Sequence, residues 1–209
     1  MRTTPTLTPA QAWARLEAGN ARFAAGDPPS GDTSSQRRSV LSRGQEPFAL
    51  VFGCSDSRVS AELVFDQGLG DLFVVRTAGH VTDSGVLGSI EYGVAVLGIP
   101  LVVVLGHDSC GAVGATLDVL AGGEMPQGYV RDVVERVTPS VLSARRLAGG
   151  EVTPEEVLVE HVRESVDQLE RRSVVVAEAV AEGRCAVVGA VYALAEGQAR
   201  VVEVVGSTS

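Results

Sequence analysis

The chain is predicted to adopt an α/β fold with a central, mostly parallel sheet flanked by helices. Short runs rich in β-branched residues recur along the sequence, and they are apolar throughout instead of alternating with polar residues. Helix-length stretches lie between these runs. Strands that are apolar on both faces are typical of parallel sheets covered by helices, and alternation of strands with helices produces such sheets.

Five strands are predicted. The four runs expected to form parallel strands are residues 48–52, 72–75, 101–105 and 186–192. After the fourth run, residues 195–198 form a turn that leads into residues 200–205, which are predicted to be an antiparallel edge strand.

Helices are predicted between the strands, at residues 84–97, 111–120, 131–147 and 154–182. The last of these has the best-defined start. Thr153 supplies an N-cap hydroxyl and Pro154 suits the first turn, while Glu155 and Glu156 place negative charge near the positive end of the helix dipole.

A single domain is expected to span residues 1–209, since a domain contains roughly 100 to 200 residues. Residues 1–45 are predicted to form an N-terminal helical arm and linker. Within them, residues 1–25 have an amphipathic helical pattern that includes Trp13 and Leu16, whereas residues 33–45 are polar and have no hydrophobic period. We therefore expect a surface connection before the first strand.

Composition argues against several classes of partner. The 17 Lys and Arg residues face 26 Asp and Glu residues, and the net charge of −9 opposes a nucleic-acid partner. No apolar stretch reaches the ~20 residues of a membrane span, and the N-terminal residues lack the apolar region of a secretory signal. We expect no membrane association and a cytoplasmic location. The three cysteines are expected to be reduced thiols that bind a metal or pack in the core.

Two clusters of polar residues follow predicted strands. Cys54 comes directly after the first strand, and His107 and Cys110 come directly after the third. In a twisted parallel sheet the carboxyl ends of neighbouring strands open a crevice where the strand order reverses, so the two clusters can meet there. Two thiolates and one imidazole suit Zn²⁺ and leave a fourth coordination position open. A His-x-x-Cys pair alone also fits a buried thiol beside a surface histidine, and Cys54 favours the metal site.

At this point the chain resembles the β-class carbonic anhydrases, which carry C-x-D-x-R after one strand and H-x-x-C-G after another. The matching residues are Cys54, Asp56 and Arg58, then His107, Cys110 and Gly111. The resemblance runs from about residue 11 to residue 205 and includes residues 65–71, 74–79 and 89–92. It agrees with the fold read from the strand pattern and also supplies a substrate.

The resemblance implies a zinc-dependent carbonic anhydrase, which interconverts carbon dioxide with bicarbonate and a proton by attack of zinc-bound hydroxide. It implies that Asp56 accepts a hydrogen bond from that hydroxide, while an ion pair with Arg58 keeps the carboxylate off the metal. In some relatives the aspartate is instead a fourth zinc ligand in a closed state. Because two thiolates neutralise the ion, activity is expected to rise on the alkaline side. The alternative for Asp56 and Arg58 is a simple surface ion pair.

The resemblance also assigns a substrate pocket. Gln45 matches the polar donor, Phe73, Ala78 and Tyr92 match the wall, and Gly111 fits a backbone approach near the metal. Ala78 is smaller than the aliphatic residue of plant-like members. In the family the pocket forms between subunits, so a homodimer or homotetramer is expected. Relatives with a non-catalytic bicarbonate site carry Trp where this chain has Val51, so that type of regulation is not expected.

The remaining histidines and the third cysteine are predicted to take no part in the site. Cys185 is expected to pack in the core. His80 is predicted to be a solvated loop residue, with proton transfer as the alternative. His161 lies in a charged helix and is predicted to face water without a role.

Two other functions stay open at this stage. One is hydrolysis of carbon disulfide or carbonyl sulfide on the same fold. The other is a non-catalytic binding or sensor protein in which Asp56 permanently closes the zinc site.

Overall fold

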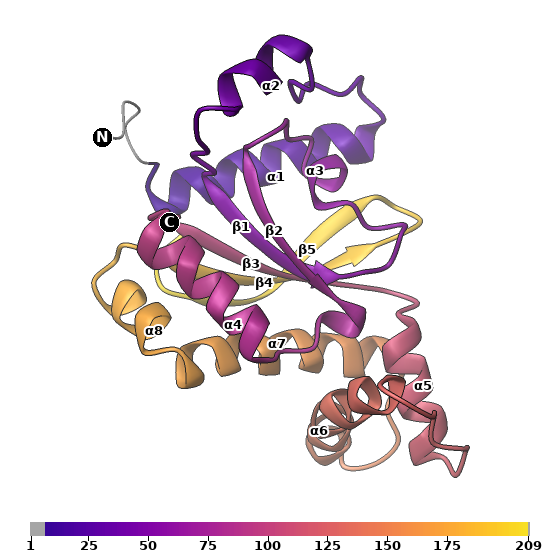
Figure 1. Ribbon diagram of the computed structural model, residues 1–209. Coiled ribbons are helices and arrows are strands. Elements are labelled where there is room, and N and C mark those ends of the chain that lie inside the picture. The colour runs from indigo at the N-terminus through magenta and orange to yellow at the C-terminus, as the bar shows by residue number, and fades with distance from the viewer. Residues whose placement is uncertain (1–6, 209) are drawn as a thin grey trace.

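The computed structural model describes residues 7–208, which form a three-layer α/β unit (Figure 1). The strands are β1 (Ala49–Cys54), β2 (Leu72–Thr77), β3 (Leu101–His107), β4 (Ala186–Ala193) and β5 (Gln198–Val205). The helices are α1 (Pro9–Ala25), α2 (Ser35–Leu41), α3 (Ala61–Val64), α4 (Ser84–Glu91), α5 (Gly111–Leu120), α6 (Val130–Ala148), α7 (Pro154–Arg172) and α8 (Val174–Ala181). Two short turns are η1 (Ala78–His80), of the 3-10 type, and η2 (Tyr92–Val96), of the π type.

The sheet has the strand order β2-β1-β3-β4-β5, with four parallel strands and an antiparallel β5. The predicted fold class is therefore confirmed. Strand β2 lies on one side of β1, and β3 lies on the other side. The direction in which successive strands are added to the sheet therefore reverses between β1 and β3. In open α/β sheets, ligands bind at the carboxyl ends of the strands at this reversal.

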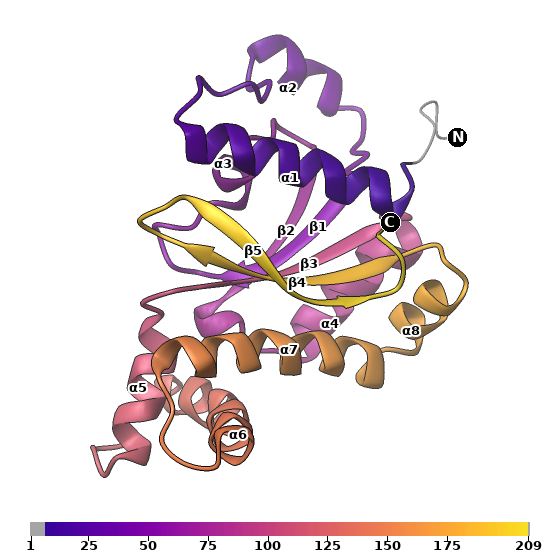
Figure 2. The same ribbon diagram turned by 180° about the vertical axis from the view of Figure 1, so that it is seen from behind.

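Helices cover both faces of the sheet (Figures 1 and 2). On one face, Trp13 and Leu16 of α1 pack against Val51 and Val103. On the other face, α4, α7 and α8 cover the alternate strand residues, with Leu158 among those packed there. Strands β1, β3 and β4 are buried, whereas β2 is partly exposed because it lies at the edge. The expectation that all four parallel strands are buried is therefore wrong for β2.

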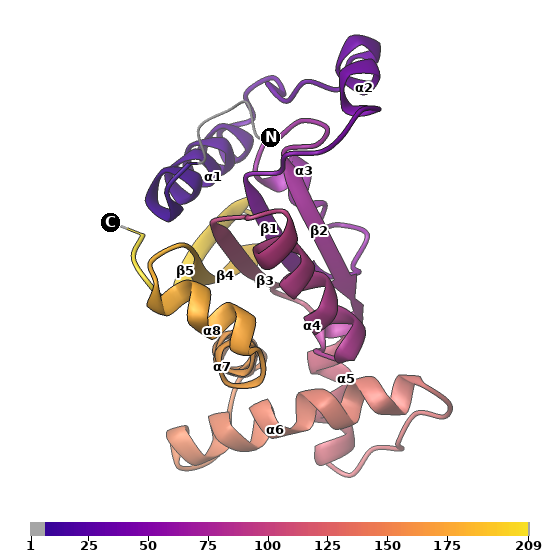
Figure 3. The same cartoon turned by 60° about the vertical axis from the view of Figure 1, so that its left-hand side comes forward.

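Helices α5 and α6 lie beyond the end of the sheet, next to α7 (Figure 3). They enclose a separate apolar cluster that includes Val113, Val137 and Val157. Cys54 and Cys110 belong to the same cluster, so these two helices give the carboxyl ends of β1 and β3 an apolar surrounding.

The helix predicted at residues 154–182 is two helices, α7 and α8. Ser173 has an extended backbone between them and is the C-cap of the first and the N-cap of the second. Its hydroxyl accepts from Val176 N and donates to Glu91. A serine side chain that satisfies backbone donors in this way favours a helix start over a helix interior.

Other helix predictions need smaller corrections. The stretch 84–97 is the α-helix α4 followed by the wider turn η2. The stretch 33–45, predicted to be an irregular connection, contains the helix α2. The arm helix begins at Pro9, where Thr8 and Gln11 form a capping box. Residues 1–6 of its predicted range lie outside the described part of the chain. Helices α5 and α6 agree with prediction within one residue at either end.

Candidate metal site

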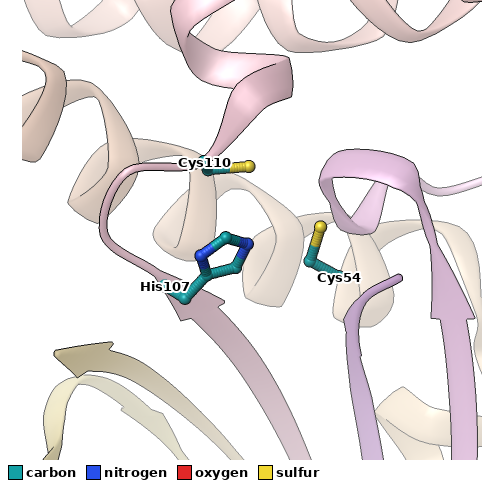
Figure 4. A group of neighbouring side chains, drawn as sticks. All are labelled: Cys54, His107 and Cys110. Atoms are coloured by element: carbon teal, nitrogen blue, oxygen red, sulfur yellow. The ribbon is translucent and has the colours of Figure 1, made fainter. Parts of the chain in front are cut away.

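The structure brings Cys54 together with His107 and Cys110, although Cys54 is far from the other two in sequence. Cys54 is the last residue of β1 and His107 the last residue of the neighbouring strand β3. Cys110 precedes α5 as its N-cap residue. Figure 4 shows the three side chains pointing toward one another, and their ligand atoms all lie within 4.8 Å of one another.

The three donor atoms fit one metal ion. The Nδ1 atom of His107 lies 2.7 Å from the carbonyl oxygen of Asp108, which can only accept, so Nδ1 carries the proton and Nε2 presents its lone pair. Nε2 is buried and forms no hydrogen bond with any part of the chain between residues 7 and 208. Two sulfurs and one imidazole nitrogen are ligand types that zinc accepts, and their closeness would allow them to hold one metal ion.

The two sulfurs interact directly with each other. Hydrogen bonding from the Cys110 thiol lowers the pKa of Cys54 below its ordinary value, and the same contact raises the pKa of Cys110. The Gly79 N–H donates to the Cys54 sulfur at 3.3 Å. One thiolate is therefore stabilised at neutral pH, which prepares the pair to bind a cation.

Asp56 lies beside the group, with Oδ2 3.8 Å from His107 Nε2. The Arg58 guanidinium donates to both of its carboxylate oxygens, at 2.9 and 2.7 Å, and the Arg58 N–H donates to Oδ1. These hydrogen bonds hold the pKa of Asp56 well below its usual range. Arg58 also reaches the carbonyl of Ser109 at 3.3 Å, so it links the loop after β1 to the loop after β3.

Backbone contacts position the first loop. Arg76, near the end of β2, donates to the carbonyl oxygens of Cys54 at 2.9 Å and Asp56 at 2.6 Å. Arg76 lies within residues 74–79, which resemble the family, and the sequence predicts no contact for it. An arginine at the end of an otherwise apolar strand is a signal that could have indicated such a contact.

The residues assigned to the substrate pocket do not converge within one chain. Ala78 follows the end of β2 near Cys54, and Gly111 begins α5. Phe73, however, lies four residues before Thr77 in β2, and Thr77 is the residue that pairs with Cys54. Phe73 is therefore about 13 Å along the strand from the level of Cys54. Its ring contacts that of Tyr92, with centroids 6.2 Å apart. Gln45 is exposed and precedes β1 at the far end of the sheet.

A cavity of about 900 Å³ adjoins the metal group on the side of α5 and α7. His107, Cys110, Val113, Leu158 and Arg200 are among its lining residues. Of the five residues assigned to the pocket, Gly111 alone lines it. A Cβ at Gly111 would meet no described atom within 4 Å, and the backbone approach to the metal stays a prediction.

Both remaining histidines differ from prediction. His80 is 1% exposed and not solvated, because its ring packs against the rings of Phe52 and His161. Burial lowers its pKa well below the ordinary value. His161 is 4% exposed, so the prediction that it faces water is wrong. Its nitrogens lie 2.8 Å from Ser140 Oγ and 2.8 Å from the Gly79 carbonyl. Cys185 is buried in the core, as predicted.

The fold and the site define an α/β protein with a buried Cys-His-Cys group that could hold a metal ion at the reversal of its strand order. A sequence model of the carbonic anhydrase family matches residues 49–199, and the structure is similar to solved β-carbonic anhydrases. The chain belongs to the β-class carbonic anhydrase family and is a carbonic anhydrase.

Relatives resemble the chain over nearly its whole length. It is 56% identical over 194 residues to a carbonic anhydrase of Mycolicibacterium smegmatis, covering 93% of each chain. It is 55% identical over 195 residues to carbonic anhydrase 2 of Mycobacterium tuberculosis, again covering 93% of each. A Coccomyxa β-carbonic anhydrase, solved in complex with acetazolamide, superposes with a TM-score of 0.73 and 25% identity, over 93% of this chain and 84% of that one.

Among the helices within residues 7–208, none combines the length and the apolar character that crossing a bilayer requires.

Proposed function

We propose that the chain catalyses the reversible hydration of carbon dioxide to bicarbonate and a proton, with zinc held by Cys54, His107 and Cys110. The observation that carries this proposal is the buried convergence of two sulfurs with an imidazole Nε2 that forms no hydrogen bond within the described residues. When bound, zinc supplies Lewis-acid chemistry that makes water a nucleophile near neutral pH. The three protein ligands leave a fourth position for that water.

Asp56 and Arg58 are proposed to orient the attacking water. The lowered pKa keeps Asp56 ionised at working pH, so its carboxylate acts as a hydrogen-bond acceptor. Both of its oxygens accept from Arg58, which holds the carboxylate in place and opposes its movement onto the metal. This geometry supports an open, catalytic site over the alternative of a zinc site closed by Asp56.

The proposal includes a second copy of the chain. Strand β2 leaves one of its edges unpaired within the described sheet, and the aromatic pair Phe73 and Tyr92 lies beside it, with Tyr92 45% exposed. In a homodimer or homotetramer that covers this edge, Gln45, Phe73 and Tyr92 are proposed, from the family resemblance, to contribute to the substrate pocket of the other subunit. A cytoplasmic location stays a prediction from the sequence.

Substitution of the ligands tests the metal site. Cys54→Ser, His107→Ala and Cys110→Ser should each lose bound zinc and all activity, because two protein ligands do not hold the ion. Metal analysis and stopped-flow carbon dioxide hydration measure the two effects. Cys185→Ala is the matched control: it removes a buried thiol of the core and should keep one zinc per chain.

The same assays separate the roles of Asp56 and Arg58. Asp56→Asn and Arg58→Ala should keep zinc but lose at least about 100-fold in turnover, the lower limit for a positioned proton acceptor. Full turnover in either variant would contradict the proposed role of Asp56 and Arg58 in orienting the water. Faster reaction of the wild-type protein with carbonyl sulfide or carbon disulfide than with carbon dioxide would instead reassign the substrate.

A further inference from the structure

A chain of hydrogen bonds leads from α6 to the Cys54 sulfur. The Gly79 carbonyl, 2.8 Å from His161 Nε2, can only accept, so Nε2 carries the proton and Nδ1 accepts from the Ser140 hydroxyl at 2.8 Å. Burial lowers the pKa of His161, which agrees with a neutral ring that has one donor and one acceptor. The N–H of Gly79 then donates to Cys54 Sγ at 3.3 Å.

The residue in the middle of this chain has an unusual backbone. Gly79 has a φ of +62°, in the left-handed region, and a Cβ at this position would lie 2.5 Å from the Ala112 Cβ. His80, which follows it, also has a positive φ of 41°. Non-glycine residues rarely adopt this conformation, so the surrounding structure must hold the turn. Gly79 is held on both sides: its N–H contacts Cys54 and its C=O accepts from His161.

An N–H group that donates to a thiolate has two effects on a metal bound to that sulfur. It orients the sulfur, and it withdraws electron density that the sulfur would otherwise donate to the metal. The position of the Gly79 turn therefore bears directly on the bond between Cys54 and the metal.

We propose that His161, supported by Ser140, is a positioning residue that holds the Gly79 turn against Cys54 and thereby strengthens the attachment of zinc to this ligand. The inference deepens the proposed function and rests on it, because it takes Cys54 to be a zinc ligand. A histidine that only filled the core would leave the metal unaffected.

The test compares three variants of the zinc-loaded protein. His161→Leu keeps an apolar side chain in the site but removes the donor to Gly79. His161→Gln keeps an N–H donor at about the same reach. Ser165→Ala is the matched control, because the Ser165 hydroxyl donates to the carbonyl of His161 itself and does not touch Gly79.

Two measurements report on the metal independently of activity. In His161→Leu, zinc release to a chelating dye should be about tenfold faster, the lower end of the effect of losing a partner behind a metal ligand. In the cobalt-substituted protein, the thiolate-to-metal charge-transfer band should move to longer wavelength, because a sulfur without its N–H donor gives electrons more readily. His161→Gln should restore both properties, and Ser165→Ala should leave both unchanged.

Release and spectrum identical to wild type in His161→Leu would overturn the inference, as would a lower melting temperature without any change at the metal. If His161→Leu does not fold, Ser140→Ala decides: a band shift in the same direction supports the inference, and an unchanged band overturns it. A wild-type protein that binds no zinc would overturn the proposed function, and this inference with it.

Discussion

Asp66 is a single residue that ties together distant segments of the chain. It has a φ of 48°, in the left-handed region, and its side chain is 6% exposed. Arg22 donates to Oδ2 at 2.6 Å, and Ser30 donates to both oxygens from its N–H and its hydroxyl. Burial opposes the charge, but these hydrogen bonds outweigh it and lower the pKa of Asp66 to about 2. The carboxylate thus holds the N-terminal arm to the loop before β2.

Asp66→Asn should destabilise the fold at pH 7 by about 2 kcal/mol, the scale of a hydrogen bond to a charged group. Asn keeps the shape and tolerates the left-handed backbone. Because the pKa of Asp66 is lower in the folded state than its ordinary value near 4, its contribution is fully present above pH ~5 and is lost as the pH falls toward 2.

Urea unfolding of the wild-type and Asp66→Asn proteins, at a series of pH values and one protein concentration, measures the difference in their free energies of unfolding. The gap in free energy of unfolding should be constant from pH 8 to pH 5 and should narrow below about pH 4. A gap that persists unchanged to pH 3 would show that the charge is not its cause.

The capping box at the start of helix α7 helps to determine where His161, two turns later, makes its contact with η1. Thr153 and Glu156 form a capping box, with the Thr153 hydroxyl accepting from Glu156 N at 3.2 Å and the Glu156 carboxylate accepting from Thr153 N at 2.7 Å. This start defines the register of the helix, and two turns later the register places His161 toward η1. Glu160, next to His161 in sequence, is also buried and accepts from the Ser143 hydroxyl of α6. The charged sequence around His161 therefore suggested an exposure that packing against α6 removes.

Thr153→Ala should cost about 1 kcal/mol of stability, because the N–H of Glu156 loses its side-chain acceptor. Thermal unfolding at fixed protein concentration measures the effect. Thr138→Ala is a suitable control: it removes a hydroxyl that donates within α6, to the Val134 carbonyl, and caps nothing. Equal effects of the two substitutions would contradict a capping role for Thr153.

At the scale of the whole molecule, the N-terminal arm is part of the core. Gly19 of α1 approaches the loop after α3 so closely that a Cβ there would lie 1.8 Å from the Phe65 carbonyl oxygen. Asn20, beside it, donates to the carbonyls of Val64 and Gly197. Helix α1 therefore joins the loop after α3 to the turn between β4 and β5.

Gly19→Ala should destabilise the protein by about 1 to 3 kcal/mol, the cost of overpacking. The backbone carbonyl of Phe65 cannot move aside as a flexible side chain would, so α1 must shift away from the sheet. Gly44→Ala is the control, because a Cβ at Gly44 meets nothing within 4 Å. Denaturant unfolding of the two variants compares them, and a Gly19→Ala protein as stable as Gly44→Ala would show that the arm is docked loosely.

The amino-acid sequence by itself determined a mostly parallel five-stranded sheet and the alternation of strands and helices along the chain, because apolar runs and helix starts are local signals. It also indicated the Cys54, His107 and Cys110 group, since the carboxyl ends of β1 and β3 meet in a parallel sheet. Only the tertiary structure decided that Ser173 divides α7 from α8, that His161 is buried against Gly79, and that Arg76 holds the loop after β1. These features depend on contacts between residues far apart in sequence, and no local pattern encodes which backbone group a buried side chain will meet.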